Sequence, residues 1–356
     1  IQETPEDVKE GDVVDIADHK GRFLARGHYS SGSLAIKILS FENEEINADW
    51  FSQKLQQAKA FREELNLPSE STNCYRLVHG EGDGMAGLII DIYETIAVVQ
   101  THSKGMHRSL EHIKIGLIKL GFDRIVLKPV GREKPTILSG TITEREKVME
   151  LDSAYNVDIL QGQKTGFFLD QRANRDLVKL YAKGRKVLNV FSYTGGFSIS
   201  ALAGGALEAL SLDASAKALD LAQENAILNG FSEKHSIIKA DAVPFLETNE
   251  AGVYDLIILD PPAFAKHKSA RHNAIQAYRR INEAAMKSIS KGGILFTFSC
   301  SQVIDKQMFY DTIVSAAIQA KREVKVLHHL RQPEDHPVNI FHPEGEYLKG
   351  LVLKIF

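Results

Sequence analysis

Polar and reactive side chains follow the apolar segments of the C-terminal half of the chain. Ser192, Gly195 and Gly196 come after KVLNVF, while Asp213 and Asp241 end the next two segments, ALSLD and SIIKAD. The paired glycines let the backbone approach a ligand closely and open a helix N-terminus toward it. An acidic side chain roughly 20 residues further on can accept both ribose hydroxyls of a nucleoside. A lone Asp is usually a turn residue or helix cap, but three such ends in succession favour a nucleoside cofactor.

The fourth and fifth segments end in a carboxylate and a thiol. Asp260 ends YDLIILD and precedes Pro261 and Pro262, which let neither strand nor helix continue, so we expect it beside a rigid turn and the ring of Phe264. Such a turn can grip a planar base, and a purely structural turn fits the pattern equally well. Cys300 follows GGILFTFS. Most cysteines in apolar surroundings are inert, but its place after the DPP turn predicts that it reaches a bound base.

These segments alternate with helical patterns such as SAKALDLAQENAILNG, which is typical of buried parallel strands in a doubly wound α/β sheet. Ligands of such a sheet bind at the carboxyl ends of its strands. We therefore predict a Rossmann-like domain over residues 159–356.

The sequence upstream predicts three further parts. Short strands in GDVVDIAD, HKGRFLARGHYS and SLAIKILSF indicate a β-rich module over residues 1–45, and helical spacing of apolar residues indicates a linker helix within 46–70. Residues 71–158 are predicted to form an α+β domain, with a helix near 105–120. Its expected strands are YRLVHG, GLIIDIY, TIAVVQTH, DRIVLKPV and VMELDSAYNVDIL.

Composition excludes several classes of protein. The 356 residues are 44% hydrophobic and 25% charged, which excludes a disordered or fibrous chain, and a net charge of -3 means that any nucleic-acid site must be local. Two cysteines are too few for a disulfide framework or zinc cluster, so we predict a reducing, cytoplasmic setting and no metal. No apolar run reaches the roughly 18 residues that span a bilayer, so no membrane association is expected. Because the sequence starts at Ile1 rather than Met, we treat the first module as incomplete.

Charge is uneven along the chain. Residues 266–291 hold seven Lys or Arg against one Glu, whereas residues 1–45 hold ten Asp or Glu against five Lys or Arg. The basic stretch is either a solvated helix face or a loop and helix that contacts phosphates, and the acidity of the first module argues against a strong grip on RNA. The predicted substrate-binding residues are Pro261, Pro262, Phe264, Lys266, Lys268, Arg271, Arg279 and Arg280.

Five motifs together resemble the class I S-adenosylmethionine-dependent rRNA methyltransferases. They are QKTGFFLDQR (163–172), NVFSYTGGFS (189–198), LDAS (212–215), DPPAFAK (260–266) and FSCSQ (298–302). Within that class the chain is similar to the bacterial and archaeal family that makes 5-methylcytosine in large-subunit rRNA. The resemblance spans the whole chain, because the N-terminal part is similar to a PUA RNA-binding module and the middle to that family's linking α+β domain. It implies S-adenosylmethionine as cofactor and RNA, in particular large-subunit rRNA, as partner.

The resemblance also implies a role for each matching residue around the cofactor. Ser192, Gly195 and Gly196 would approach its methionine end, Asp213 its ribose and Asp241 its adenine. The stretch from 164 to 172 would close over the site, with Phe167 and Phe168 as walls. The predicted cofactor-binding residues are Lys164, Phe167, Asp170, Arg172, Ser192, Tyr193, Gly195, Gly196, Asp213, Asp241 and Asp260.

For catalysis, the resemblance implies Cys300 as nucleophile and Asp260 on the edge of the base. Cytosine carbon 5 is too poor a nucleophile to attack the methyl sulfonium unaided, so a thiolate first adds at carbon 6. Asp260 would share or donate a proton at the ring nitrogen. The better-known RNA cytosine methyltransferases carry a second Cys where this chain has Ala263, so a one-cysteine mechanism is required. The base that removes the carbon 5 proton is not identified by the sequence.

Other functions remain open at this point. The single cysteine also resembles the uridine carbon-5 enzymes, whose turn is usually DPPR followed by SCNP, and a DPPA turn is compatible with methylation of an exocyclic amine. A non-catalytic RNA-binding assembly factor is a third alternative, and a hydride-transferring Rossmann enzyme fits least because the dinucleotide fingerprint is missing. The DHP segment at 335–337 could line the site or form a turn, and GEGDG at 80–84 fits a tight hairpin better than a phosphate site. The oligomeric state is open, with a homodimer as one alternative.

Overall fold

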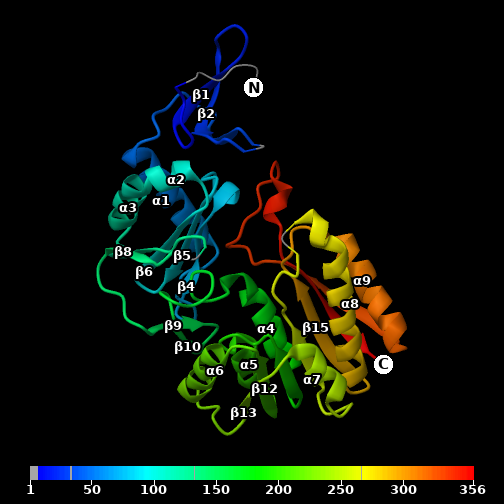
Figure 1. Ribbon diagram of the computed structural model, residues 1–356. Coiled ribbons are helices and arrows are strands. Elements are labelled where there is room, and N and C mark those ends of the chain that lie inside the picture. Colours follow the sequence, from blue (N-terminus) through cyan, green and yellow to red (C-terminus); the bar gives the residue numbers. More distant parts are fainter. Residues whose placement is uncertain (1–6, 33, 132, 266) are drawn as a thin grey trace. The chain divides into compact units, whose positions relative to one another are not determined.

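The computed structural model describes residues 7–32, 34–131, 133–265 and 267–356, and the chain divides into two compact units (Figure 1). Unit 1 consists of Ile1–Met149, Val157–Leu169 and Glu334–Gly345, and unit 2 consists of Glu150–Asn156, Asp170–Pro333 and Glu346–Phe356. The segment Glu334–Gly345 thus groups with unit 1, although it lies inside the predicted last domain. The four predicted domain ranges stay predictions.

Unit 2 is built on a seven-stranded sheet in the order β13-β12-β11-β14-β15-β17-β16. The first five strands in this order are parallel, and β17 runs antiparallel between β15 and β16. The five apolar segments are therefore confirmed as parallel strands. Their bounds and those of the last two strands are β11 Lys186–Val190, β12 Glu208–Asp213, β13 His235–Lys239, β14 Leu256–Leu259, β15 Gly293–Ser299, β16 Val324–Leu330 and β17 Lys349–Ile355.

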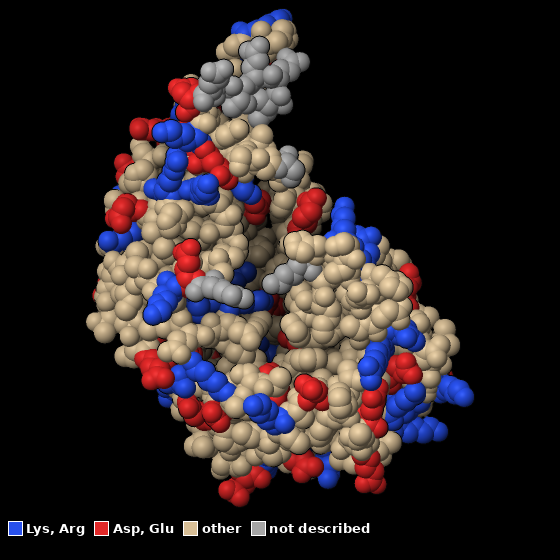
Figure 2. Space-filling view, viewed as in Figure 1, with Lys and Arg blue, Asp and Glu red and all other residues tan. Residues whose placement is uncertain are grey.

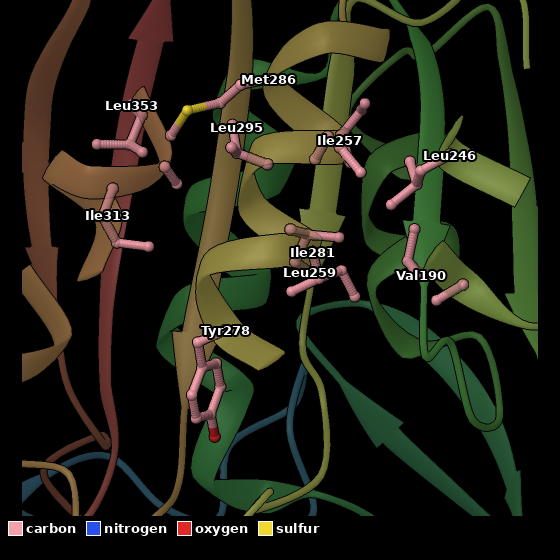
Figure 3. Packing of buried hydrophobic residues seen from close by; sticks show 14 of the residues in the cluster. Val190, Leu246, Ile257, Leu259, Tyr278, Ile281, Met286, Leu295, Ile313 and Leu353 are labelled. Carbon is pink, nitrogen blue, oxygen red and sulfur yellow. The ribbon is translucent and has the colours of Figure 1, made fainter. Parts of the chain in front are cut away.

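The sheet of unit 2 is covered by helices on both faces. Leu256 and Ile258 of β14 pack with α4 and α5 in one cluster. Ile257 and Leu259 pack with α7, α8 and α9 in another cluster, part of which is shown in Figure 3. This alternation follows from the two-residue period of a strand. Each such fully buried side chain contributes roughly 1.5–3 kcal/mol, so both faces hold the strand ends rigidly in place. The helices are α4 Arg172–Tyr181, α5 Gly196–Ala203, α6 Ala216–Leu228, α7 Ala242–Thr248, α8 Arg271–Ser288 and α9 Lys306–Ala320.

Unit 1 is built around two larger sheets and the helices that accompany them. A three-stranded antiparallel sheet, β1-β2-β3, matches the predicted first strands, and a five-stranded sheet follows in the order β4-β5-β6-β7-β8. Within the same unit α1 packs against α3. The elements are β1 Val13–Ala17, β2 Phe23–Tyr29, β3 Ile36–Ser40, α1 Ala48–Glu64, β4 Cys74–His79, β5 Leu88–Tyr93, β6 Ile96–Thr101, α2 Lys104–Arg108, α3 Leu110–Lys119, β7 Arg124–Leu127 and β8 Thr136–Ser139.

Two local predictions about this region need correction, and one strand was not predicted. The segment VMELDSAYNVDIL is two strands, β9 (Glu146–Glu150) and β10 (Ser153–Val157), because Leu151 and Asp152 both adopt positive φ and turn the chain. The helix expected near 105–120 is interrupted at Ser109 and forms α2 and α3. The short strand β8 was not expected from the sequence. GEGDG forms a 3-10 turn, Gly80–Asp83, between the antiparallel strands β4 and β5, in line with the predicted hairpin.

The surface carries both signs of charge. On the face shown in Figure 2, Lys and Arg are interspersed with Asp and Glu, as the near-zero net charge leads us to expect. Within the described ranges, no helix is both long and apolar enough to cross a bilayer, and no three His, Cys, Asp or Glu side chains gather as a metal site. Because charges of both signs are interspersed on this face, a binding site for a polyanion must be a local group of basic residues.

Candidate active site

The carboxyl ends of the parallel strands bring the predicted residues to one edge of the unit 2 sheet. From β11 the chain proceeds to β12 and β13 on one side and then to β14 and β15 on the other. This reversal of strand order is the position at which doubly wound sheets bind ligands. Ser192 follows β11 and Asp260 follows β14, so these two residues flank the reversal. Cys300 follows β15, the next strand along.

The loop after β11 holds a strained backbone. Phe191 and Tyr193 have φ angles of 60° and 46°, in the left-handed region that favours glycine, and Gly195 follows with a φ of 79°. Such residues cost of order 1–3 kcal/mol each and cluster at functional sites. At Gly195 a Cβ would also lie 3.0 Å from the Cβ of Ala222 in α6. The glycine is therefore required both by its conformation and by the close approach of the helix.

Two polar side chains hold this loop in its shape. Asp213, at the end of β12, accepts the backbone N–H of Tyr193 at 2.9 Å and that of Ser215 at 2.9 Å. Asn225, fully buried in α6, donates from Nδ2 to the carbonyl of Thr194 at 3.0 Å. The turn-residue interpretation of Asp213 is thus correct in part. Each carboxylate oxygen keeps a second lone-pair site, so the side chain can still accept hydroxyl groups of a ribose.

The loop also carries an unsatisfied group that fits a polar ligand. Ser192 is buried, and its Oγ has no hydrogen-bond partner in the part of the chain that the structure describes. A buried hydroxyl without a partner costs roughly 1–3 kcal/mol, which a bound ligand with a polar head would recover. Asp241 is exposed beyond β13 and makes no side-chain hydrogen bond as the N-cap of α7. These residues therefore fit the nucleoside cofactor that the sequence predicts.

The motif at 163–172 is divided between the two units. In unit 1 the hydroxyl of Tyr93 donates to Thr165 Oγ1 at 2.9 Å and accepts the N–H of Phe167 at 3.1 Å, and Thr165 donates to Asp91 at 2.6 Å. The Lys164 ammonium lies 4.4 Å from the centre of the Phe168 ring. Asp91 and Tyr93 of β5 thus hold the first half of the motif in place.

The second half of the motif belongs to unit 2. Asp170 is buried and accepts a hydrogen bond from the hydroxyl of Tyr347 at 2.7 Å, and Arg172 is the buried first residue of α4. One turn along α4, Arg175 makes a buried pair with Glu150 at 2.6 and 2.8 Å. Asp170 and Arg172 are thus rigidly held, and their contact with a cofactor stays a prediction.

The DPP turn packs against a tyrosine that the sequence did not indicate. The ring of Phe264 lies 4.7 Å from that of Tyr278 in α8, at an interplanar angle of 55°. Burial raises the pKa of Tyr278 to about 12, and negative charge on Cys300 and Asp260 acts in the same direction. Figure 3 shows the Tyr278 hydroxyl directed away from the labelled aliphatic core residues. The phenol therefore stays protonated beside the two predicted catalytic residues.

Cys300 is presented just beyond the sheet. Leu259 pairs with Thr297 in the β14–β15 ladder, so Cys300 extends about two residues, roughly 7 Å, further past the edge than Asp260. Its side chain is partly exposed, whereas Ser299 and Ser301 on either side are buried. Ser301 Oγ donates to the carbonyl of Ala265 at 2.7 Å. This bond ties the loop that carries the thiol to the DPP turn.

A buried lysine contacts the backbone on both sides of this cysteine. Lys349 opens β17, pairs with Ser299 across the β15–β17 ladder, and donates from Nζ to the carbonyls of Ser301 at 2.9 Å, Tyr347 at 3.0 Å and Ser299 at 3.4 Å. Burial lowers its pKa to about 8, while negative charge at Cys300 raises it. The only sequence signal for this residue is a lysine at the start of an apolar strand, YLKGLVLKIF.

The basic stretch is not uniform. Lys268 lies in a 3-10 turn before α8, and Arg271, the first residue of α8, has an Nε without a hydrogen-bond partner among the described residues. Arg280 instead pairs with Glu247 of α7 at 3.1 Å, and Arg279 lies roughly 12 Å along the helix from its start. The start of α8 is thus more suited to a phosphate than its middle. Lys266 lies outside the described residues.

The DHP segment is anchored in unit 1. Asp335 accepts the backbone N–H of Arg76 at 2.9 Å, and its carbonyl accepts a hydrogen bond from Arg62 at 2.8 Å. His336 is buried beside it, with its ring 5.2 Å from that of His79. These contacts explain why Glu334–Gly345 groups with unit 1. No local pattern in the sequence indicates them, because the partners are more than 250 residues apart.

Comparison with known proteins agrees with this architecture. Residues 125–352 match a family described as S-adenosylmethionine-dependent methyltransferase, and residues 1–41 match a PUA-like domain. A crystal structure of SMU.776, described as a methyltransferase complexed with SAH, has a TM-score of 0.87 at 24% identity and covers 97% of this chain and 92% of its own, which supports the fold. The predicted fold class is thereby confirmed.

Curated relatives align over nearly the full length. Proteins named Ribosomal RNA large subunit methyltransferase I are 38% identical in Vibrio vulnificus, 39% in Aeromonas salmonicida and 36% in Escherichia coli. Each alignment covers 97% of this chain and 91% of the relative. The chain therefore belongs to the ribosomal RNA large subunit methyltransferase I family, and it is an S-adenosylmethionine-dependent methyltransferase with a PUA-like domain at its N-terminal end.

Proposed function

We propose that this protein transfers a methyl group from S-adenosylmethionine to carbon 5 of a cytosine in large-subunit rRNA, through a covalent adduct with Cys300. The name of its relatives supports large-subunit rRNA as the substrate. The observation that carries the choice of atom is the partly exposed thiol at the carboxyl end of β15, one strand from the carboxylate that ends β14. Methylation of an amino group requires no thiol in this place.

The chain's own residues account for the steps at the base. The Cys300 thiolate adds to carbon 6, which moves an electron pair onto carbon 5 and makes it nucleophilic. Asp260 donates or shares a proton at the ring nitrogen, where negative charge develops during the addition. After methylation a base takes the proton from carbon 5, the carbon 5–carbon 6 double bond re-forms, and the thiolate leaves. When bound, S-adenosylmethionine supplies the methyl group as an electrophilic sulfonium.

The cofactor contacts in this proposal come from the strand ends of unit 2. The Ser192 hydroxyl and the strained loop around Gly195 would meet the methionine part, and Asp213 would accept the ribose hydroxyls through its remaining lone pairs. Asp241 would meet the adenine. The unpartnered Ser192 hydroxyl and the exposed Asp241 carboxylate support this assignment, because neither is used up by contacts in the described chain.

The RNA contacts in this proposal are local rather than global. Lys268 and Arg271 lie at the start of α8, directly after the DPP turn, and would neutralise phosphates next to the target base. We also propose that the PUA-like domain contacts the RNA, although its acidity limits its electrostatic share. Because Arg280 already has a carboxylate partner, it should contribute less than Arg271.

The test is to incubate unmodified large-subunit rRNA with the protein and methyl-labelled S-adenosylmethionine, digest it, and identify the labelled nucleoside by mass spectrometry. The expected product is 5-methylcytidine. Label in 5-methyluridine or on an exocyclic nitrogen would show that another atom, not cytosine carbon 5, accepts the methyl group. Absence of label, with the wild-type protein folded and the RNA bound, would favour the assembly-factor alternative.

A further inference from the structure

Lys349 holds its ammonium between the carbonyls on either side of the predicted nucleophile. Strand β17 pairs antiparallel with β15, and Figure 3 shows Leu353 of β17 beside Leu295 of β15. The same ladder places Lys349 opposite Ser299. From there Nζ reaches the carbonyls of Ser299 and Ser301, the residues before and after Cys300.

The three N–H donors of this ammonium all go to neutral acceptors. Their partners are the carbonyls of Ser299, Ser301 and Tyr347, and in the described part of the chain no carboxylate is hydrogen-bonded to Nζ. A buried cation held only by carbonyls keeps most of its charge uncompensated. A negative group next to it is therefore stabilised, and the adjacent candidate is the thiol of Cys300, which heads the charges that act on Lys349.

We propose that Lys349 is a positioning residue that holds Cys300 as a thiolate and fixes the backbone that carries it. This inference rests on the proposed function, since it assigns Lys349 a role in preparing the nucleophile of that reaction. A free thiol ionises with a pKa of about 8.5 and is mostly protonated at neutral pH, and a neighbouring cation lowers this value. The proton goes to solvent, and the thiolate is then ready to add to carbon 6.

Other charges around the pair act in both directions. Asp305 at the N-cap of α9 and Glu346 before β17 favour the ammonium and oppose a thiolate, but Glu346 is itself paired with Lys306 at 2.6 Å. On the α8 side, the protonated Tyr278 senses the charges of both Cys300 and Asp260. His329, Arg331 and Tyr310 line the same cavity of about 390 Å³ as Lys349. Among these groups, Lys349 alone is a buried cation that contacts the Cys300 backbone on both sides.

A purely structural role is the alternative that the test has to exclude. A lysine that caps three buried carbonyls stabilises the end of β15 whether or not the thiol reacts. Loss of activity in a Lys349 variant would follow from either role. The readout must therefore be the ionisation of the thiol itself.

The experiment measures the rate at which iodoacetamide alkylates Cys300 as a function of pH, without RNA or S-adenosylmethionine, with the modified peptide quantified by mass spectrometry. The proteins are wild type, Lys349→Gln, which keeps donors but loses the charge, and Lys349→Arg, which keeps the charge. Lys354→Gln is the matched control, because Lys354 lies on the same strand and donates to the carbonyl of Gly292 at the far end of β15.

We expect a wild-type midpoint below about 8.5, a rise of roughly one pH unit or more in Lys349→Gln, and little change in Lys349→Arg or Lys354→Gln. An unchanged midpoint in folded Lys349→Gln would overturn the proposal and leave Lys349 a structural residue. If Lys349→Gln does not fold, the wild-type profile decides alone, since a midpoint at or above 8.5 contradicts the proposal. Failure of the proposed function has a different signature, namely continued methylation by Cys300→Ala.

Discussion

The two cysteines of the chain lie in opposite environments. Cys74 is fully buried in β4 of unit 1, and its Sγ donates to the carbonyl of Met149 at 3.5 Å. Cys300 is partly exposed beyond β15 of unit 2, between two buried serines whose carbonyls accept hydrogen bonds from Lys349. Both cysteines border apolar strands in the sequence, so residue type and local pattern do not separate them. Their difference comes from position at a strand end and from a cation contributed by another strand.

The same contrast extends to the charged groups of the two units. In the interior of unit 1, Arg76 donates to Asp91 at 2.8 and 2.9 Å, and Arg62 pairs with Asp83. These charges use each other as partners. At the strand ends of unit 2, the carboxylates of Asp213, Asp241 and Asp260 are exposed or partly exposed. Substitutions in the first set should therefore reduce stability, and substitutions in the second should reduce activity.

The largest effect is expected from the cysteines themselves. Cys300→Ala should lower methyl transfer by on the order of 10⁴ or more, because loss of a covalent nucleophile removes the whole route, while stability changes little. Cys74→Ala should leave the rate per folded molecule within a few-fold and lower the free energy of unfolding by about 1 kcal/mol. Labelled-methyl transfer and denaturant unfolding measure the two quantities. Continued turnover in Cys300→Ala would contradict a catalytic role for Cys300.

A buried carboxylate of unit 1 should show the opposite behaviour. Asp91→Asn leaves the Arg76 guanidinium buried without its counter-charge and weakens the hold on Thr165, so the free energy of unfolding of unit 1 should fall by about 3–5 kcal/mol. Asp49→Asn is the control, because Asp49 is exposed in its pair with Lys119 and should cost about 0.5 kcal/mol or less. Urea unfolding, with hydrogen exchange to separate the two units, checks both. Equal losses in the two variants would show that burial is not what distinguishes these charges.

The carboxylate that ends β14 should affect rate rather than stability. Asp260→Asn should reduce kcat about 10²–10³-fold if the side chain manages the proton at the ring nitrogen. Asp255→Asn is the matched control: Asp255 lies just before the same strand and accepts a hydrogen bond from Ser290 at 3.0 Å, far from the carboxyl edge. The measurement is single-turnover methyl transfer. A kcat in Asp260→Asn close to that of Asp255→Asn would remove Asp260 from the catalytic step.

The sequence predicted the strands of the unit 2 sheet and the polar residues that follow them, because both are marked by local patterns. The runs that form β11, β12, β13, β14 and β15 are long, apolar and bounded by polar ends, so both the sheet and the residues at its edge could be placed. The turn at Leu151 and Asp152 was not predicted, because two residues other than glycine take positive φ there. Strand β8 was not predicted, because it is only four residues long and partly exposed.

The residues that the sequence missed depend on distant partners. Tyr278 is identified by its ring contact with Phe264, and Lys349 by its hydrogen bonds to carbonyls 48 and 50 residues upstream. Likewise, Tyr93 holds a loop more than 70 residues further along. Each of these contacts requires strand order and register, which periodicity does not supply. The sequence thus indicated candidate residues at the strand ends, but not the side chains from other elements that contact them.

The smallest effect is expected at Asp213. This residue tests whether one side chain at a strand end both shapes the loop and contacts the cofactor. Its carboxylate accepts two backbone N–H groups and, in our proposal, the ribose hydroxyls as well. Asp213→Asn keeps the size but loses the charge and one acceptor, so KM for S-adenosylmethionine should rise about 10–100-fold with kcat nearly unchanged. Asn225→Ala loosens the same loop through the Thr194 carbonyl without touching a ribose. If both variants raise KM equally, Asp213 acts only by shaping the loop; a larger rise in Asp213→Asn assigns it a direct contact with the cofactor.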